Sequence, residues 1–335
     1  MRCIRLTEER TRRKAIRLFL KSFDVSVRQR YFRVMAPAVF SITSDVDHRK
    51  EVLFFIARLR EVCESKRHVV ISFAKTRKMF TCGTLLFYSE LRNILNRDET
   101  IAEVRMLQSS NLKVMQVLKQ IGLMSILQYS NSIEPTFDDV VKWKFTFGNN
   151  VNGPRYEDIA YSIDGGLEEK TREGLFKAFS EAMTNTHQHA YIEMDGVRSV
   201  AIGDESWWAF SQVKNGYIHI VFCDLGIGIP GSLPMKRPDW VRDITARIGF
   251  GDAEVIQGAV HISRSRTGLD NRGKGLKQLV EAIKEVDAGH LLILSRKGGY
   301  RYQDGEERTH NYRDSIDGTL IEWKLPLPRA RGACI

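Results

Sequence analysis

The sequence lacks the features of several common protein classes. Its five cysteines, Cys3, Cys63, Cys82, Cys223 and Cys334, are odd in number and scattered, without the spacing of a zinc site or a disulfide framework. This pattern suits a reducing compartment. No apolar run approaches the roughly 20 residues of a membrane span, and the first residues are too charged for a secretory signal. We therefore expect a cytoplasmic protein that does not associate with membranes.

Common signatures of nucleotide and nucleic-acid binding are also missing. The P-loop pattern and the dinucleotide fingerprint are absent, as are zinc-finger and aromatic-basic RNA-binding motifs. The net charge of +10 keeps nucleic acid open as a partner, because residues 1–33 carry eleven Lys and Arg against three acids. We favour a solvated helix face for this segment, with Ile16, Leu18, Phe19 and Leu20 packed inward.

A helix is expected over residues 168–191. Its apolar stripe has helical spacing and consists of Leu175, Phe179, Ala182, Met183, Thr186 and Ala190. Glu181, Asn185 and His189 are four residues apart on another stripe, so a carboxylate, an amide and an imidazole would point into one space. Magnesium prefers hard oxygen ligands and shares them with phosphates, which makes Asn185 a candidate ligand. The alternative is an ordinary solvated face.

A buried strand that enters a tight turn is expected at residues 217–228. The apolar run 217–223 ends in Asp224, and Gly226 and Gly228 follow. An ionised carboxylate accepts hydrogen bonds only, so Asp224 suits the exocyclic amine of adenine and opposes the acceptor oxygen of guanine. The glycines allow close backbone approach or positive φ. A turn without a ligand is the alternative.

A glycine loop is expected to lead into a helix near residue 275. Gly273 and Gly275 flank Lys274, and apolar residues at helical spacing follow from Leu276. Backbone N–H groups and the helix dipole favour an anion there, and Arg272 and Lys274 add positive charge. We favour triphosphate binding over a simple helix cap and turn.

In this order and spacing, the three segments resemble the GHKL ATPase superfamily, which holds histidine kinases, DNA gyrase B, mismatch-repair ATPases and anti-sigma-factor serine kinases. The resemblance covers about residues 155–327 and its N-box, Asp-x-Gly-x-Gly box and later glycine box. It implies a Bergerat-type α/β sandwich, with a mixed sheet covered by helices, that binds ATP and Mg²⁺.

The resemblance also implies roles for single residues. Asn185 would bind magnesium, and Asp224 would read adenine in a pocket shaped by Gly226 and Gly228. Gly273 and Gly275 would wrap the phosphates, and residues 230–272 would form a nucleotide lid. The hydroxyl of Thr319, in a late Gly-Thr pair, would support the adenine aspartate.

Glu181 and the ending His189-Ala-Tyr are most similar to the anti-sigma-factor kinase branch, which implies that Glu181 is a general base. A carboxylate near magnesium can activate either a water or a serine hydroxyl, so slow ATP hydrolysis and Ser/Thr phosphotransfer both stay open. A non-catalytic, nucleotide-gated interaction module is another alternative. No phosphoacceptor histidine on a dimerising helical hairpin is recognised, so a sensor histidine kinase is not expected.

The expected role is regulatory. ATP closure of the lid would change the surface offered to a protein partner, and a homodimer stays open. An ATP-dependent clamp on nucleic acid is less favoured, because such clamps carry a following transducer domain and few residues follow Leu325.

The first half has its own alternation of strands and helices. Helices are expected at 51–64, after Gly83 and at 113–121, and strands at 69–73 and 101–107. Residues 69–73, 79–86 and 117–123 resemble a STAS-type domain, the fold of anti-anti-sigma factors. Cys82 and Phe80 stand where that family has the phosphorylated serine and an aspartate, so the resemblance implies a degenerate domain that packs on or reports to the ATPase.

The sequence therefore predicts a two-domain α/β protein. The expected parts are a basic segment at 1–33, a STAS-like domain at 34–130, a linker at 131–154, a GHKL domain at 155–327 and a tail at 328–335. A strand of uncertain ownership is expected at 140–147, and Trp207 and Trp208 are expected to be packing residues.

Overall fold

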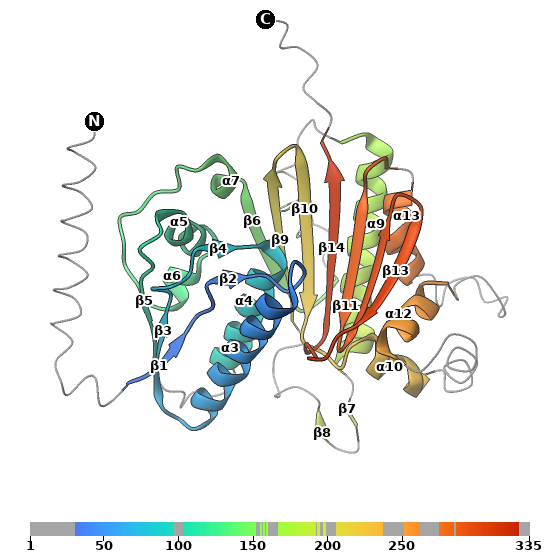
Figure 1. Cartoon of the computed structure of the whole chain (residues 1–335). Helices are drawn as coiled ribbons and strands as arrows, with labels where there is room; N and C mark the ends of the chain where they lie inside the picture. The colour runs from blue at the N-terminus through green and yellow to red at the C-terminus, as the bar shows by residue number, and fades with distance from the viewer. Residues whose placement is uncertain are drawn as a thin grey trace, which may run out of the picture.

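The fold is described from a computed structural model of the chain (Figure 1). It describes residues 31–96, 103–151, 167–191, 193–194, 197–198, 206–236, 251–261, 275–284 and 286–327, together with residues 155, 157 and 159. The basic segment is therefore described only from residue 31 on, and the tail at 328–335 lies outside the described residues.

The first part of the chain forms a three-stranded parallel sheet in the order β1-β3-β5, beside a short parallel pair, β2-β4. The elements are β1 Tyr31–Met35, β2 Val39–Phe40, α3 Val46–Glu64, β3 His68–Ser72, β4 Lys78–Met79, α4 Thr81–Asn96, β5 Val104–Leu107, α5 Leu112–Gln120, α6 Leu123–Ile126 and α7 Asp138–Val141. Each helix and strand expected in this half is confirmed to within a few residues. Helical crossovers between neighbouring parallel strands make this part α/β.

The second part forms a seven-stranded sheet in the order β13-β12-β11-β14-β10-β9-β6. Its strands are β6 Trp143–Gly148, β9 Trp207–Lys214, β10 Tyr217–Asp224, β11 His290–Ser295, β12 Gly298–Gln303, β13 Glu306–Asn311 and β14 Thr319–Pro326. Every neighbouring pair is antiparallel, so the expectation of a mixed sheet is corrected. Parallel pairs occur instead in the first part of the chain. The strand expected near residues 140–147 is β6, at one edge of the large sheet.

The other elements of the described part of the chain include helical segments and a short hairpin. They are α9 Glu169–Asn185, the π segment η2 Thr186–Ala190, β7 Glu193–Met194, β8 Val197–Arg198, α10 Ile229–Lys236, α12 Asp252–His261 and α13 Gly275–Lys284. The helix expected at 168–191 thus becomes a π turn in its last five residues. Among the described residues, no helix has the length and apolar character that crossing a bilayer requires.

Both faces of the central strands of the large sheet are covered. Along β10, Ile218, Ile220 and Phe222 pack with α9, α12 and α13, whereas Val221 and Cys223 face the cluster formed with α3 and α4. Figure 1 shows α9 and α13 on one side of the sheet and α3 and α4 on the other. A strand buried on both faces reads as a continuous apolar run, which explains the sequence of β10.

The cluster on the α3 and α4 side is continuous with the core of the first part of the chain. It joins Phe40, Phe55 and Phe87 to Phe210 and Leu294 of the large sheet. The two sheets therefore share one hydrophobic core through α3 and α4.

Candidate functional site

The C-terminal end of α9 carries the first group of predicted site residues. Glu181 and Asn185 are half-buried in the last turns of α9, and His189 is half-buried within η2. Burial raises the pKa of the Glu181 carboxyl above its usual range. His189 belongs to the π segment that follows Asn185, the last residue of α9. Single π turns of this kind occur frequently at functional sites.

Asp224 is the last residue of β10 and is almost completely buried, with 6% exposure. Its Oδ1 accepts hydrogen bonds from the backbone N–H groups of Gly226, at 2.9 Å, and Thr319, at 3.3 Å. Burial raises its pKa to about 7, although both hydrogen bonds act to lower it. Both of these donors engage Oδ1. Among the described residues, no donor is recorded for Oδ2.

The turn after Asp224 packs directly on η2. Ile227 N donates to Ala190 O at 2.8 Å, and a Cβ at Gly226 would lie 2.3 Å from the same oxygen. Gly228 has φ +75°, a conformation that side chains rarely adopt. Only glycine fits at position 226, because η2 packs against the turn after β10. This contact explains why the first glycine after Asp224 is needed.

Gly318 and Thr319 lie against the other side of Asp224. Gly318 has φ +71°, and a Cβ there would lie 2.0 Å from Asp224 O. The structure differs from the expectation for Thr319 in the atom involved. Its backbone N–H reaches Asp224, whereas its hydroxyl lies 3.1 Å from Ser295 Oγ.

Two residues that the sequence reasoning missed complete the packing around Asp224. Tyr191 Oη donates to Ser206 O at 2.6 Å and accepts from Leu225 N at 3.1 Å. Ser295 Oγ donates to Gly318 O at 2.9 Å and accepts from Ile229 N at 2.9 Å. The sequence places Ser295 at the end of an apolar strand, but it does not show that this strand lies beside β14. The pairing of Ser295 with Thr319 depends on that strand order.

The third predicted segment is described only in part. Arg272, Gly273 and Lys274 lie outside the described residues, and Gly275 is the first residue of α13. Leu276 is half-buried and packs on the cluster beneath α9 and α13. The helix expected after the glycine loop is therefore confirmed. The expected lid, residues 230–272, contains α10 from its second residue on, Gly251 and all of α12, and residues 237–250 and 262–272 lie outside the described part of the chain.

Comparisons with known proteins identify no family for this chain. No model of a known protein family matches the chain, and no curated protein matches it significantly. The site must therefore be interpreted from its chemistry.

That chemistry combines three kinds of group at one end of the large sheet. A buried carboxylate lies at the end of β10, a second carboxylate and an amide lie at the end of α9, and backbone N–H groups hold the first carboxylate in place. Among the described residues, no cluster of His, Cys, Asp and Glu is large enough to hold a metal ion by itself. A metal at Asn185 would need further oxygen ligands from a bound molecule or from water.

Proposed function

We propose that this chain is an intracellular ATP-binding regulatory protein. In this proposal, residues 155–327 form a GHKL nucleotide domain of the Bergerat type, and residues 34–130 form a STAS-like domain packed on it. The observation that carries the proposal is the buried Asp224 carboxylate, which two backbone N–H groups hold by one oxygen.

Adenine fits this carboxylate better than guanine does. The exocyclic amine of adenine can donate to Oδ2, whereas guanine presents an acceptor oxygen at the same position. A desolvated acceptor without a donor costs ~1–3 kcal/mol, which is enough to discriminate between ATP and GTP. The tight approach of Gly226 and Gly228 to their neighbours supports this assignment, because it fixes the backbone on one side of the carboxylate.

The end of α9 suits the phosphate end of the same nucleotide. Asn185 would supply one oxygen ligand to magnesium, which supplies positive charge to stabilise a transferred phosphoryl group. Glu181 would accept a proton from the attacking group, and its raised pKa makes it a stronger base than an exposed glutamate. From η2, the nucleotide would be contacted by His189. From the glycine loop, it would be contacted by the backbone of Gly273 and Gly275 and by the charged side chains of Arg272 and Lys274.

Nucleotide binding would signal to a protein partner through closure of the lid at residues 230–272. Slow ATP hydrolysis and phosphotransfer to a serine or threonine of that partner use the same Glu181. The binding-only alternative needs Asp224 but not Glu181.

The first test is thermal unfolding with magnesium and ATP, GTP or no nucleotide. At a hundred times its dissociation constant, a ligand stabilises the folded protein by roughly 2.7 kcal/mol. We expect ATP, and not GTP, to raise the Tm, and Asp224→Asn to remove the rise. Equal shifts with both nucleotides, or no shift with either, would contradict adenine recognition by Asp224.

The second test separates catalysis from binding. Glu181→Gln keeps the size of the side chain and removes the base, so ATP should still raise the Tm while phosphate release or phosphotransfer falls at least a hundredfold, an effect of about 10² being usual for a general base. Full biological activity in Glu181→Gln, with activity lost in Asp224→Asn, would establish the binding-only alternative instead.

A further inference from the structure

The loop between β13 and β14 is held by two arginines of α3. This loop, residues 312–318, leads directly into Thr319. Arg49 is buried, with 3% exposure, and its Nη2 donates to Asp314 O at 3.3 Å, while Nη1 donates to Ile42 O at 3.2 Å. Its guanidinium also lies 3.9 Å from the centre of the Tyr312 ring. Arg49 thus joins α3, in the first part of the chain, to the start of the loop.

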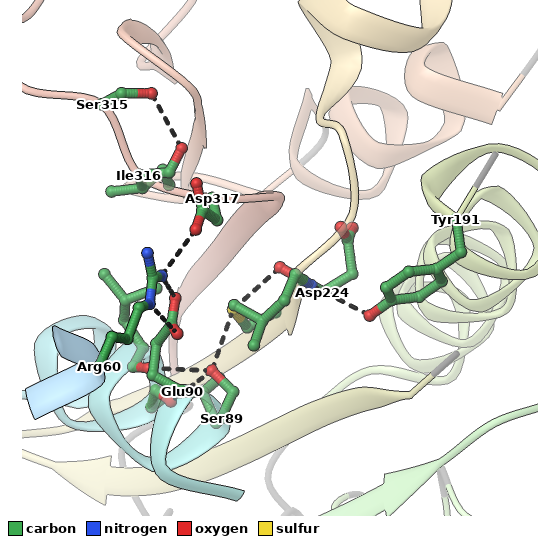
Figure 2. A network of polar contacts seen from close by, with 12 residues as sticks. Arg60, Ser89, Glu90, Tyr191, Asp224, Ser315, Ile316 and Asp317 are labelled. Atoms are coloured by element: carbon green, nitrogen blue, oxygen red, sulfur yellow. Dashed lines mark hydrogen bonds and ion pairs between the residues drawn. The ribbon is translucent and has the colours of Figure 1, made fainter. Parts of the chain in front are cut away.

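Arg60 holds the end of the same loop. Its Nε donates to Glu90 Oε2 at 2.9 Å, and its Nη2 contacts both Glu90 and Asp317 Oδ2, the latter at 2.7 Å. The Glu90 side chain is buried, whereas 56% of the Asp317 side chain is exposed. Figure 2 shows this ion-pair network beside Ser89 and Asp224. Arg60 therefore links α3, α4 and the residue just before Gly318.

Asp317 lies two residues before Thr319, whose N–H donates to Asp224. Only Gly318 separates the two residues, and its backbone is already confined by the close approach of Asp224 O. Thr319 begins β14, where it pairs with Asp224 and Ser295, and its N–H is one of the two donors to Asp224 Oδ1. A displaced Asp317 would disturb this N–H through Gly318. A second contact joins the same layers, because Ser89 Oγ lies 3.5 Å from Cys223 Sγ, next to Asp224 in β10.

We propose that Arg60 is a positioning residue for the nucleotide site, through which the α3 and α4 layer sets the affinity for ATP. The inference rests on the proposed function, because it takes Asp224 as the adenine-binding group. Arg60 does not touch the nucleotide. It holds Asp317, and through Gly318 it holds the N–H that orients the Asp224 carboxylate. Whatever shifts α3 relative to the loop would then change nucleotide binding, which gives the first part of the chain a regulatory role.

The test uses Asp317→Ala in the full chain. This change removes the Arg60–Asp317 ion pair at the end of the loop but leaves the Arg60–Glu90 pair and the Arg49 contacts intact, so the protein should still fold. Two readouts are compared with the unmodified protein: hydrogen exchange at the Thr319 amide without nucleotide, and the dissociation constant for mant-ATP with magnesium. Arg58→Ala is the matched control, because Arg58 lies on the same helix in an exposed ion pair with Glu61.

We expect Asp317→Ala to speed exchange at Thr319 and to weaken mant-ATP binding about tenfold, which corresponds to ~1.4 kcal/mol. The Tm of the nucleotide-free variant should stay close to that of Arg58→Ala, and Asp317→Glu should restore both readouts. Arg60→Met should act in the same direction and also lower the Tm, since it leaves Glu90 buried without this cation.

The outcomes separate the inference from the proposed function. If the unmodified protein binds mant-ATP and Asp317→Ala behaves like Arg58→Ala in both readouts, the positioning role is overturned and the nucleotide site stands. If the unmodified protein binds no mant-ATP, the proposed function fails and the inference fails with it. In that case, comparing hydrogen exchange at the Thr319 amide between Asp317→Ala and the unmodified protein still measures whether Arg60 holds the loop.

Discussion

Asp224 combines a charged side chain with a site that is almost closed to water. Its two backbone hydrogen bonds favour the ionised form, and burial disfavours it more strongly, so its pKa rises from 3.8 to about 7. Burial therefore makes the ionised form of Asp224 costly in the free protein. A donor such as an amine would stabilise the ionised carboxylate.

This shift gives the free protein a pH-dependent stability. Because the folded pKa lies above the unfolded value, the contribution of Asp224 is fully present below about pH 4 and is lost as the pH rises through about 7. Asn does not titrate, so the Tm of Asp224→Asn should rise relative to the unmodified protein between pH 5 and pH 8, by a few degrees or more. Parallel Tm profiles for the two proteins, measured by circular dichroism without nucleotide, would contradict the raised pKa.

The residues predicted for the site differ in how far sequence could place them. Asp224, Gly226 and Gly228 follow an apolar run, so their position at the end of a strand was readable from local pattern alone. Ser295 and Tyr191 were not, because their hydroxyl groups act on backbone atoms from segments distant in the sequence. Nothing local to a serine or tyrosine indicates such a partner.

At the scale of elements, the site depends on the contact between η2 and the turn after β10. The helical pattern over 168–191 was correct for α9 and for the buried positions of its stripe, including Thr186 and Ala190. The pattern did not predict the π turn, because apolar spacing barely changes when one hydrogen-bonded turn widens. Ala190 O then accepts from Ile227 N, which only the packed structure brings near.

Two glycine substitutions test this contact. In Gly226→Ala, the new methyl group would lie 2.3 Å from Ala190 O and 2.4 Å from its Cβ, so we expect a loss of ~1–3 kcal/mol or more in unfolding free energy. Gly174→Ala is the control in α9, because its Cβ would meet Ala282 Cα at an ordinary 3.5 Å. Alanine in a helix is favoured over glycine by ~0.8–1 kcal/mol, so the control should gain stability.

Urea unfolding followed by far-UV circular dichroism measures both changes. Similar midpoints for Gly226→Ala and the unmodified protein would show that η2 and the turn can move apart easily. The backbone next to Asp224 would then be less rigid than the packing in the structure indicates.

At the scale of the whole molecule, the central strands β11, β14, β10 and β9 of the large sheet form an internal layer, whereas the edge strand β13 is exposed. The second face of this layer is covered by α3 and α4, and the resulting core includes Phe55 and Leu91 from the first part of the chain and Phe210, Val221 and Leu294 from the sheet. Exposing these side chains to water would cost a large amount of free energy, because the hydrophobic effect scales with the apolar area exposed. The two parts of the chain should therefore depend on each other for stability.

We expect the full chain to unfold in one cooperative transition. Near-UV and far-UV circular dichroism should give the same midpoint, and the calorimetric and van't Hoff enthalpies should agree. A fragment of residues 131–335 should lack cooperative unfolding and should aggregate, because it exposes Phe210, Val221 and Leu294. Two separate transitions in the full chain, or a monomeric fragment that unfolds cooperatively, would contradict this dependence.

The sequence by itself determined the elements and the chemistry of the proposed site. Apolar periodicity located α3, α4, α9, α13 and β10, because burial imposes the periods of helix and strand on the residues that pack. Side-chain chemistry made Asn185 a candidate magnesium ligand and Asp224 a candidate for adenine recognition, and the resemblance to the GHKL superfamily implied the role of Glu181 as a general base.

Only the tertiary structure decided how these elements meet. The order of the strands in the large sheet, the N–H of Thr319 on Asp224 and the link from Arg60 to Asp317 depend on segments that are far apart in the chain. Such contacts depend on which strands become neighbours and on the shape left between packed layers. A local pattern of residues carries little information on either, because both result from the packing of the whole molecule.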